Sequence, residues 1–156
     1  MTNLTGSNSM GDGETPPKSS DSTVIVLTPE IVKAWIGIKH FQLTEFDSPD
    51  LILSGSRMNL EFIKLLDKLR DKVGFPLHVN SGYRTPEHNA KVAKTEKSAH
   101  VAGCAADIAV SNGTERGAII EAAWGLGIKR IGVAKGFVHL DTNLGKEVPQ
   151  KVIWTY

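Results

Sequence analysis

The sequence lacks three features that would place it in a specialised class of protein. Its single cysteine, Cys104, excludes an intramolecular disulfide and any zinc site built from several cysteines. No apolar run approaches the ~20 residues needed to cross a bilayer, and the N-terminus has no signal-peptide core. A strong excess of one sign of charge is also missing, since 18 basic side chains offset 17 acidic ones and leave a net charge of +1. We therefore expect a protein made in the cytoplasm, without stable membrane insertion and without a nucleic-acid partner.

The chain does contain enough material for one ordinary domain. Its 156 residues are sufficient to bury a hydrophobic core. Residues 1–23 are rich in Ser, Thr, Gly and Asn and have little apolar surface to bury, so they are predicted to form a disordered tail. From residue 24 the composition becomes globular. We expect a single domain over residues 24–156, acting as a monomer.

Helical and extended patterns are interleaved along this predicted domain. Thr28 and Pro29 predict the start of a first helix, and Gly74 the end of a second one. Further helices are predicted over residues 85–93 and 114–127, and short strands over 75–84, 104–110 and 130–142, the last broken at Gly136. Several connections are hairpin-sized. The pattern predicts an α+β fold with a small, mostly antiparallel sheet flanked by helices.

Two of these strands carry polar side chains on an otherwise apolar face. Asp107 lies within the segment SAHVAGCAADIAV, and an ionised carboxylate is costly to bury without a partner. Strand alternation also places His139 and Asp141 on one face. Two histidines and one carboxylate form the ligand set of many catalytic zinc sites. His100, Asp107 and His139 could supply that set, although a single strand histidine is more often an ordinary core or surface residue.

Three segments carry a family resemblance. SGYRTPEHNAKV (residues 81–92), SAHVAGCAADI (98–108) and GFVHLDT (136–142) resemble the signatures of the M15 family of zinc D-Ala-D-Ala peptidases. The similarity is greatest to the branch that contains murein peptidases and phage endolysins. It covers about residues 41–156 and leaves residues 1–40 outside. It implies the hedgehog/DD-peptidase fold and a Zn²⁺ ion held by His100, Asp107 and His139.

The resemblance also implies a role for Arg84. In this family the arginine of the S-G-Y-R motif holds the substrate carbonyl or stabilises the oxyanion that forms from it. A guanidinium suits this task because it stays charged and presents a rigid fork of donors. From the residues alone, Arg84 would be interpreted as a surface side chain after a turn.

The chain departs from the family pattern at one position. Many members carry an acidic general base three residues before the last histidine, but this chain has Gly136 there. Asp141 is the first candidate for the base, because it shares a strand face with His139. The alternative is that Asp141 only orients His139 or Arg84. Glu87 and His88 are further candidates.

The resemblance predicts a zinc-dependent peptidoglycan peptidase, acting as a D,D-carboxypeptidase or endopeptidase on stem peptides or cross-links. Such an enzyme acts on the cell wall after release by lysis or delivery on a virion. A phage endolysin is one candidate, and a virion-borne or bacterial enzyme is another. The alternative is a non-catalytic, zinc-stabilised binding or virion structural module of the same fold. A small dipeptidase acting on free D-Ala-D-Ala ranks last, because it requires a lid for which the chain has few insertions.

Overall fold

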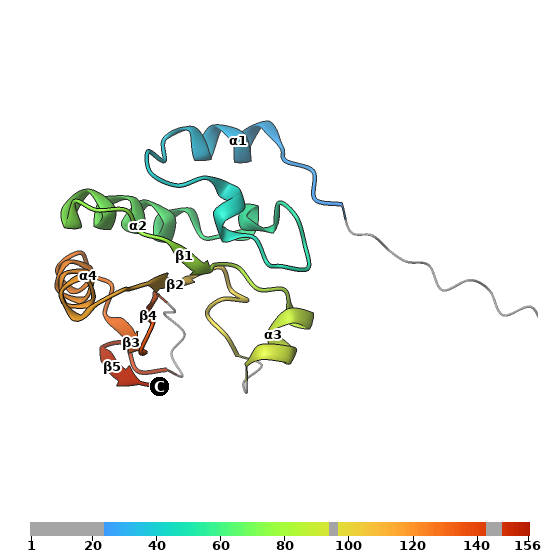
Figure 1. Cartoon of the computed structure of the whole chain (residues 1–156). Helices are drawn as coiled ribbons and strands as arrows, with labels where there is room; N and C mark the ends of the chain where they lie inside the picture. Colours follow the sequence, from blue (N-terminus) through green and yellow to red (C-terminus); the bar gives the residue numbers. More distant parts are fainter. Residues whose placement is uncertain (1–23, 94–96, 143–147) are drawn as a thin grey trace, which may run out of the picture.

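The computed structural model describes residues 24–93, 97–142 and 148–156 (Figure 1). The predicted disordered tail, residues 1–23, lies outside this part of the chain. Within the described ranges, no helix has both the length and the apolar character needed to span a bilayer. In chain order the elements are α1 (Pro29–Ile36), the 3₁₀ helices η1 (Leu43–Phe46) and η2 (Ser54–Arg57), α2 (Leu60–Val73), β1 (Val79–Ser81), α3 (Pro86–Val92), β2 (Ala105–Ala109), α4 (Gly113–Gly125), β3 (Arg130–Val133), β4 (Phe137–Asp141) and β5 (Val152–Thr155).

The predicted helix boundaries are confirmed by their caps. The Thr28 side chain accepts a hydrogen bond from the Ile31 amide at the start of α1. Thr85 does the same for the His88 amide at 3.0 Å, at the start of α3. Helix α2 ends at Gly74, whose φ of 74° lies in the left-handed region that favours glycine. These local signals are sufficient to fix where three helices begin or end.

The five strands form one mixed sheet in the order β1-β2-β4-β3-β5. Every neighbouring pair is antiparallel except β3 and β5, which are parallel. The expectation of an α+β fold with a mostly antiparallel sheet is therefore confirmed, and residues 130–142 form two strands of one hairpin. One row of directly opposed residues crosses all five strands: Ser81, Asp107, His139, Gly132 and Trp154.

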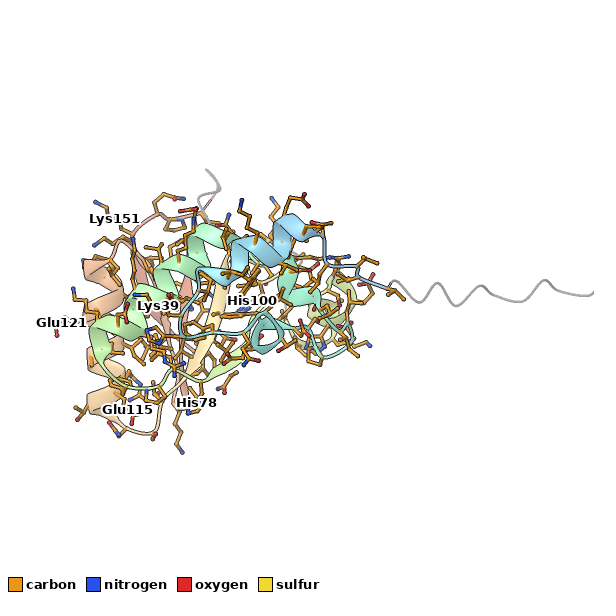
Figure 2. All side chains as sticks on the ribbon, turned by 90° about the horizontal axis from the view of Figure 1, so that it is seen from above. Lys39, His78, His100, Glu115, Glu121 and Lys151 are labelled. Atoms are coloured by element: carbon orange, nitrogen blue, oxygen red, sulfur yellow. The ribbon has the colours of Figure 1, made fainter. Side chains whose placement is uncertain are left out.

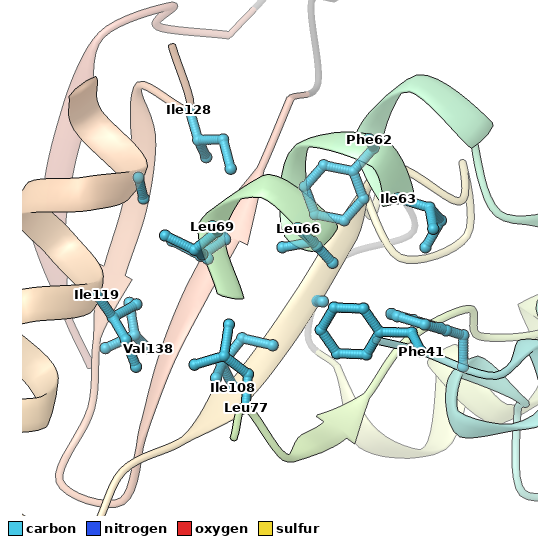
Figure 3. Packing of buried hydrophobic residues seen from close by; sticks show 14 of the residues in the cluster. Phe41, Phe62, Ile63, Leu66, Leu69, Leu77, Ile108, Ile119, Ile128 and Val138 are labelled. Atoms are coloured by element: carbon cyan, nitrogen blue, oxygen red, sulfur yellow. The ribbon is translucent and has the colours of Figure 1, made fainter. Parts of the chain in front are cut away.

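The two faces of the sheet have different environments. On one face, Ile108 of β2 and Val138 of β4 are fully buried and belong to the same apolar core as Leu66 and Leu69 of α2 and Ile119 of α4 (Figure 3). Side chains alternate along a strand, so the residues between them point to the opposite face. That opposite face carries the row with Asp107 and His139. The apolar core on one side thus fixes the register that brings the polar groups together on the other.

The segment over residues 41–58 packs against the loops that flank this polar row. A Cβ atom on Gly82 would lie 2.6 Å from the Cα atom of Phe46, and the Tyr83 amide donates to the Phe46 carbonyl at 2.9 Å. A Cβ atom on Gly103 would lie 2.3 Å from the Arg57 carbonyl oxygen. Glycine is required at both positions because the backbones approach so closely. The two loops are therefore held firmly in place.

Candidate metal centre

His100, Asp107 and His139 converge on one buried point. Asp107 and His139 are directly opposite each other on β2 and β4, and His100 lies in the turn that precedes β2. His100 Nε2 is 3.2 Å from His139 Nδ1 and 3.4 Å from Asp107 Oδ1, and His139 Nδ1 is 2.8 Å from Asp107 Oδ1. Figure 2 shows His100 in the interior, whereas Glu121 and Lys151 lie at the periphery. The predicted trio is therefore brought together in space.

On each imidazole, the nitrogen that points at the common centre is here called the front nitrogen, and the other is called the rear nitrogen. Each rear nitrogen is hydrogen-bonded to another part of the protein. His100 Nδ1 is 2.7 Å from the carbonyl oxygen of Gly82, which can only accept a hydrogen bond. His139 Nε2 is 3.0 Å from Asp141 Oδ2. These contacts favour a proton on each rear nitrogen, so each front nitrogen could offer its lone pair to a bound metal ion. Two imidazole nitrogens and one carboxylate oxygen thus point at a common centre, and this donor set fits a divalent metal ion such as zinc.

Arg84 lies beside the trio, in the short loop that connects β1 to α3. Its Nη2 atom donates to Asp107 Oδ2 at 2.8 Å and its Nε atom to Ser81 Oγ at 2.9 Å. The Arg84 amide donates to the His100 carbonyl at 3.3 Å, which fixes the backbone at the same point. The side chain is 16% exposed and borders a cavity. Arg84 therefore contacts the candidate ligand Asp107 and is not a solvated surface residue.

Asp141 stands behind His139 and not in front of it. Its Oδ2 atom faces the rear nitrogen of His139, and its Oδ1 atom accepts a bond from Arg130 Nε at 2.7 Å. The Asp141 side chain is 2% exposed. Both carboxylate oxygens are thus engaged with groups that lie away from the point where the three front atoms meet.

The local charges change the titration of two of these groups. Burial by itself would raise the pKa of Asp107, but hydrogen bonds and charge interactions with His100 and His139 hold that pKa well below its usual range. Burial by itself would lower the pKa of His139, but its bonds to Asp107 and Asp141 raise that pKa above its usual value. The carboxylate of Asp107 is therefore ionised at neutral pH, as a metal ligand must be.

A cavity of about 590 Å³ borders the trio, a size that fits a small ligand or a short peptide segment. Among the described residues that line it, Asp107 and Asp141 are the only carboxylates. Glu87, a candidate base from the sequence, lines a separate hollow next to Asp50 and Thr85. The structure therefore does not bring Glu87 to the predicted site.

Sequence reasoning missed Arg130, which also lines the cavity. It stands on the same strand face as Gly132, and its Cζ atom lies 5.6 Å from the centre of the Trp154 ring. The available signal was a basic residue within a predicted short strand, because a charged side chain that becomes buried in a sheet needs an acidic partner. That partner is Asp141.

Comparison with known proteins gives one finding on identity. The family model Peptidase M15 matches residues 26–141, which is most of the chain. A search of curated proteins found no match. The matched region includes α1, so it corrects the expectation that residues 26–40 lie outside the resemblance. It ends at residue 141, before β5, whereas the resemblance was expected to reach residue 156. Together with the convergence of the three predicted ligands, this match shows that the chain belongs to the Peptidase M15 family.

Proposed function

We propose that this M15 peptidase is a zinc enzyme that hydrolyses stem peptides or cross-links of peptidoglycan, as a D,D-carboxypeptidase or endopeptidase. The observation that carries the proposal is the meeting of His100 Nε2, Asp107 Oδ1 and His139 Nδ1 beside the Arg84 guanidinium, at the edge of an open cavity. A structural zinc site is usually closed by four protein ligands. Three ligands next to a cavity are typical of a catalytic site, where substrate needs access.

Each residue of the site has a role that follows from its contacts. His100, Asp107 and His139 would hold the zinc ion, which when bound supplies Lewis-acid polarisation of a carbonyl and acidification of a water molecule. Arg84 uses Nε and Nη2 for Ser81 and Asp107, so Nη1 is the guanidinium nitrogen through which it would donate to the substrate carbonyl oxygen. Such a donor contributes most as negative charge develops on that oxygen.

Asp141 would act as the orienting partner of His139. A general base must reach the proton it removes directly or through one water molecule. Asp141 instead accepts from the rear nitrogen of His139 and from Arg130, and it is almost fully buried. This geometry favours the orienting role over the general-base role for Asp141. In the orienting role, the carboxylate fixes the ring plane and the tautomer of His139.

The substrate and the place of action rest on the motif resemblance. The three motifs are most similar to murein peptidases and phage endolysins, whose substrates are the stem peptides of the cell wall. The cavity mouth supports a polymeric substrate, because Tyr156 borders it while remaining 71% exposed. We accordingly propose action on the cell wall, by a monomer released by lysis or carried on a virion.

Two observations favour the rival function, a non-catalytic zinc-stabilised module that binds the cell wall or forms part of a virion. Gly136 stands where many family members carry an acidic residue, and Asp141 faces away from the front of the site. The rival predicts full zinc occupancy without turnover. The proposed enzyme function predicts full zinc occupancy together with turnover.

Mass spectrometry of peptidoglycan fragments separates the two functions. Purified fragments with different stem peptides and cross-links are incubated with zinc-loaded protein, with chelator-treated protein and with the His100→Ala variant. New fragments in the first sample alone support the proposal, and their masses identify the bond. Intact fragments in all samples, with one zinc ion per folded chain, would favour the non-catalytic module.

A further inference from the structure

Arg130, the first residue of β3, contacts the strands on both of its sides. Its Nε atom donates to Asp141 Oδ1 of β4 at 2.7 Å. Its Nη1 atom donates to the carbonyl oxygen of Pro149, in the segment that leads into β5. Its Cζ atom lies 5.6 Å from the centre of the Trp154 ring, within β5. One guanidinium group therefore connects β3, β4 and the C-terminal segment.

The pairing of the strands places these groups together. Arg130 is directly opposite Asp141 in the antiparallel pairing of β3 with β4, and opposite Val152 in the parallel pairing of β3 with β5. Directly opposed residues have their side chains on the same face of a sheet. His139 lies two residues before Asp141 on β4 and so shares this face. The ion pair of Arg130 and Asp141 is thus on the face of the predicted metal ligands.

This ion pair is buried, unlike most salt bridges. The Arg130 side chain is 14% exposed, and that of Asp141 is almost fully buried. An exposed pair contributes little to stability, but a buried carboxylate needs a partner that stays charged and well oriented. A guanidinium meets both needs, because its N–H groups point in fixed directions within one plane. Arg130 therefore fixes the orientation of the Asp141 carboxylate as well as balancing its charge.

The other oxygen of the same carboxylate faces a predicted metal ligand. Asp141 Oδ2 is 3.0 Å from His139 Nε2, so the contacts run from Arg130 through Asp141 to His139. A group behind a ligating histidine sets the orientation and the tautomer of its ring. A rotation of the Asp141 carboxylate would weaken its hydrogen bond to His139. The bond from Arg130 opposes such a rotation.

We infer that Arg130 is a positioning residue for the metal centre, which holds the Asp141 carboxylate in the orientation that fixes His139. This inference rests on the proposed function, because it takes His139 as a zinc ligand. It also gives β5 a role in the metal centre. Pro149 and Trp154 lie beyond the matched residues 26–141, yet both contact the guanidinium that holds Asp141.

The zinc affinity of Arg130→Lys tests the inference, measured in the full chain by competition with a chromogenic chelator. Lysine keeps the positive charge but replaces the planar fork by a single nitrogen. Zinc affinity should fall about tenfold, at the lower end of the range for partners of ligating histidines, because Arg130 acts through Asp141. In the Asp141→Asn background, the same substitution should cause little further loss, because the group through which it acts is already changed.

Arg70→Lys is the matched control. Arg70 Nη1 also donates to a backbone carbonyl, that of His40 at 2.8 Å, and its Cζ atom lies 5.5 Å from the centre of the Phe41 ring. Arg70 borders a separate hollow on α2. The control therefore loses a similar set of contacts away from the metal centre, and its zinc affinity should equal that of the wild type.

The tautomer of His139 in the metal-free protein is a second readout, which a purely structural role of Arg130 would not change. Nitrogen NMR of the imidazole rings should find the His139 proton on Nε2 in the wild type. In Arg130→Lys we expect a mixture of the two tautomers, because the Asp141 carboxylate is no longer held in one orientation.

The outcomes separate this inference from the proposed function. Unchanged zinc affinity in Arg130→Lys, with a lower melting temperature, would make Arg130 a purely structural residue and overturn the inference. Equal losses in the wild-type and Asp141→Asn backgrounds would overturn the action through Asp141. If the wild type binds zinc and cleaves no stem peptide, the proposed function fails, and the affinities still decide on Arg130.

Two further results decide the remaining cases. If the wild type binds no zinc, the His139 tautomers decide, and the same tautomer in both proteins refutes the inference. If Arg130→Lys does not fold, NMR of the wild type decides. Zinc binding should then shift the Nε–H resonance of Arg130 and leave that of Arg70 in place, and an unmoved Arg130 resonance refutes the inference.

Discussion

Replacing Asp141 by asparagine tests whether this residue positions His139 or takes the proton. The carboxylate accepts two hydrogen bonds, from His139 Nε2 at 3.0 Å and from Arg130 Nε at 2.7 Å. An asparagine has only one acceptor oxygen, so its NH₂ group must face one of these two donors. Loss of the partner behind a ligating histidine typically weakens metal binding 10- to 100-fold. This corresponds to about 1.4–2.8 kcal/mol at 1.4 kcal/mol per tenfold.

Zinc affinity is measured by competition with a chromogenic chelator, next to kcat at saturating zinc. The positioning role predicts a 10- to 100-fold weaker zinc affinity in Asp141→Asn and substantial activity once zinc is restored. Asp67→Asn is the matched control, because Asp67 is also buried and accepts bonds from the Lys39 and His40 amides far from the site. It should lower stability and leave zinc affinity unchanged. Unchanged zinc affinity in Asp141→Asn, with kcat reduced by roughly 10² or more, would refute the positioning role and make Asp141 the general base.

Other predictions follow from single features of the structure. His100→Ala removes one of three ligands and should abolish zinc retention and activity, and full zinc content in that variant would exclude His100 from the site. Arg84→Lys keeps the charge but loses the planar fork, so kcat should fall roughly 100-fold with zinc content unchanged, and a normal kcat would contradict its role. Gly74→Ala should lower the unfolding free energy by about 1 kcal/mol, because alanine is strained at φ 74°, while Gly113→Ala, without a positive φ, should not. Burial, reinforced by the charge of Asp141, raises the pKa of the Cys104 thiol, so a disulfide reagent should modify it more slowly at pH 8 than free cysteine, and an equal rate would argue against this burial.

The sequence predicted those parts of the molecule that depend on local chemistry. Caps such as Thr28 and Thr85 act within three or four residues, so they can be recognised without knowing the fold. Strand alternation likewise placed Asp107 and His139 on polar faces before their pairing was known. The sequence pattern predicts no helix over residues 41–50, but the Gln42 amide donates to the Glu45 side chain, and this local capping stabilises the short helix η1. A four-residue turn gives too weak a periodic pattern to be predicted.

The sequence did not predict how remote segments meet at the site. The role of Asp141 depends on which nitrogen of His139 faces Asp107, and strand parity alone does not determine this. Arg130 enters the site because β3 pairs with β4 in a register that brings it to Asp141. Trp154 reaches His139 only because β5 returns parallel to β3, a crossover that neither hydrophobic pattern nor turn residues indicate. Long-range pairing, not local propensity, builds this part of the cavity.

The most direct test of the central claim is a zinc titration of metal-free protein, followed by the rate of stem-peptide cleavage. We expect the rate to be zero without metal, to rise linearly to one equivalent of zinc per chain, and to stay at zero throughout in His100→Ala. Cleavage by the metal-free protein, or full activity in His100→Ala, would contradict a catalytic zinc ion held by His100, Asp107 and His139.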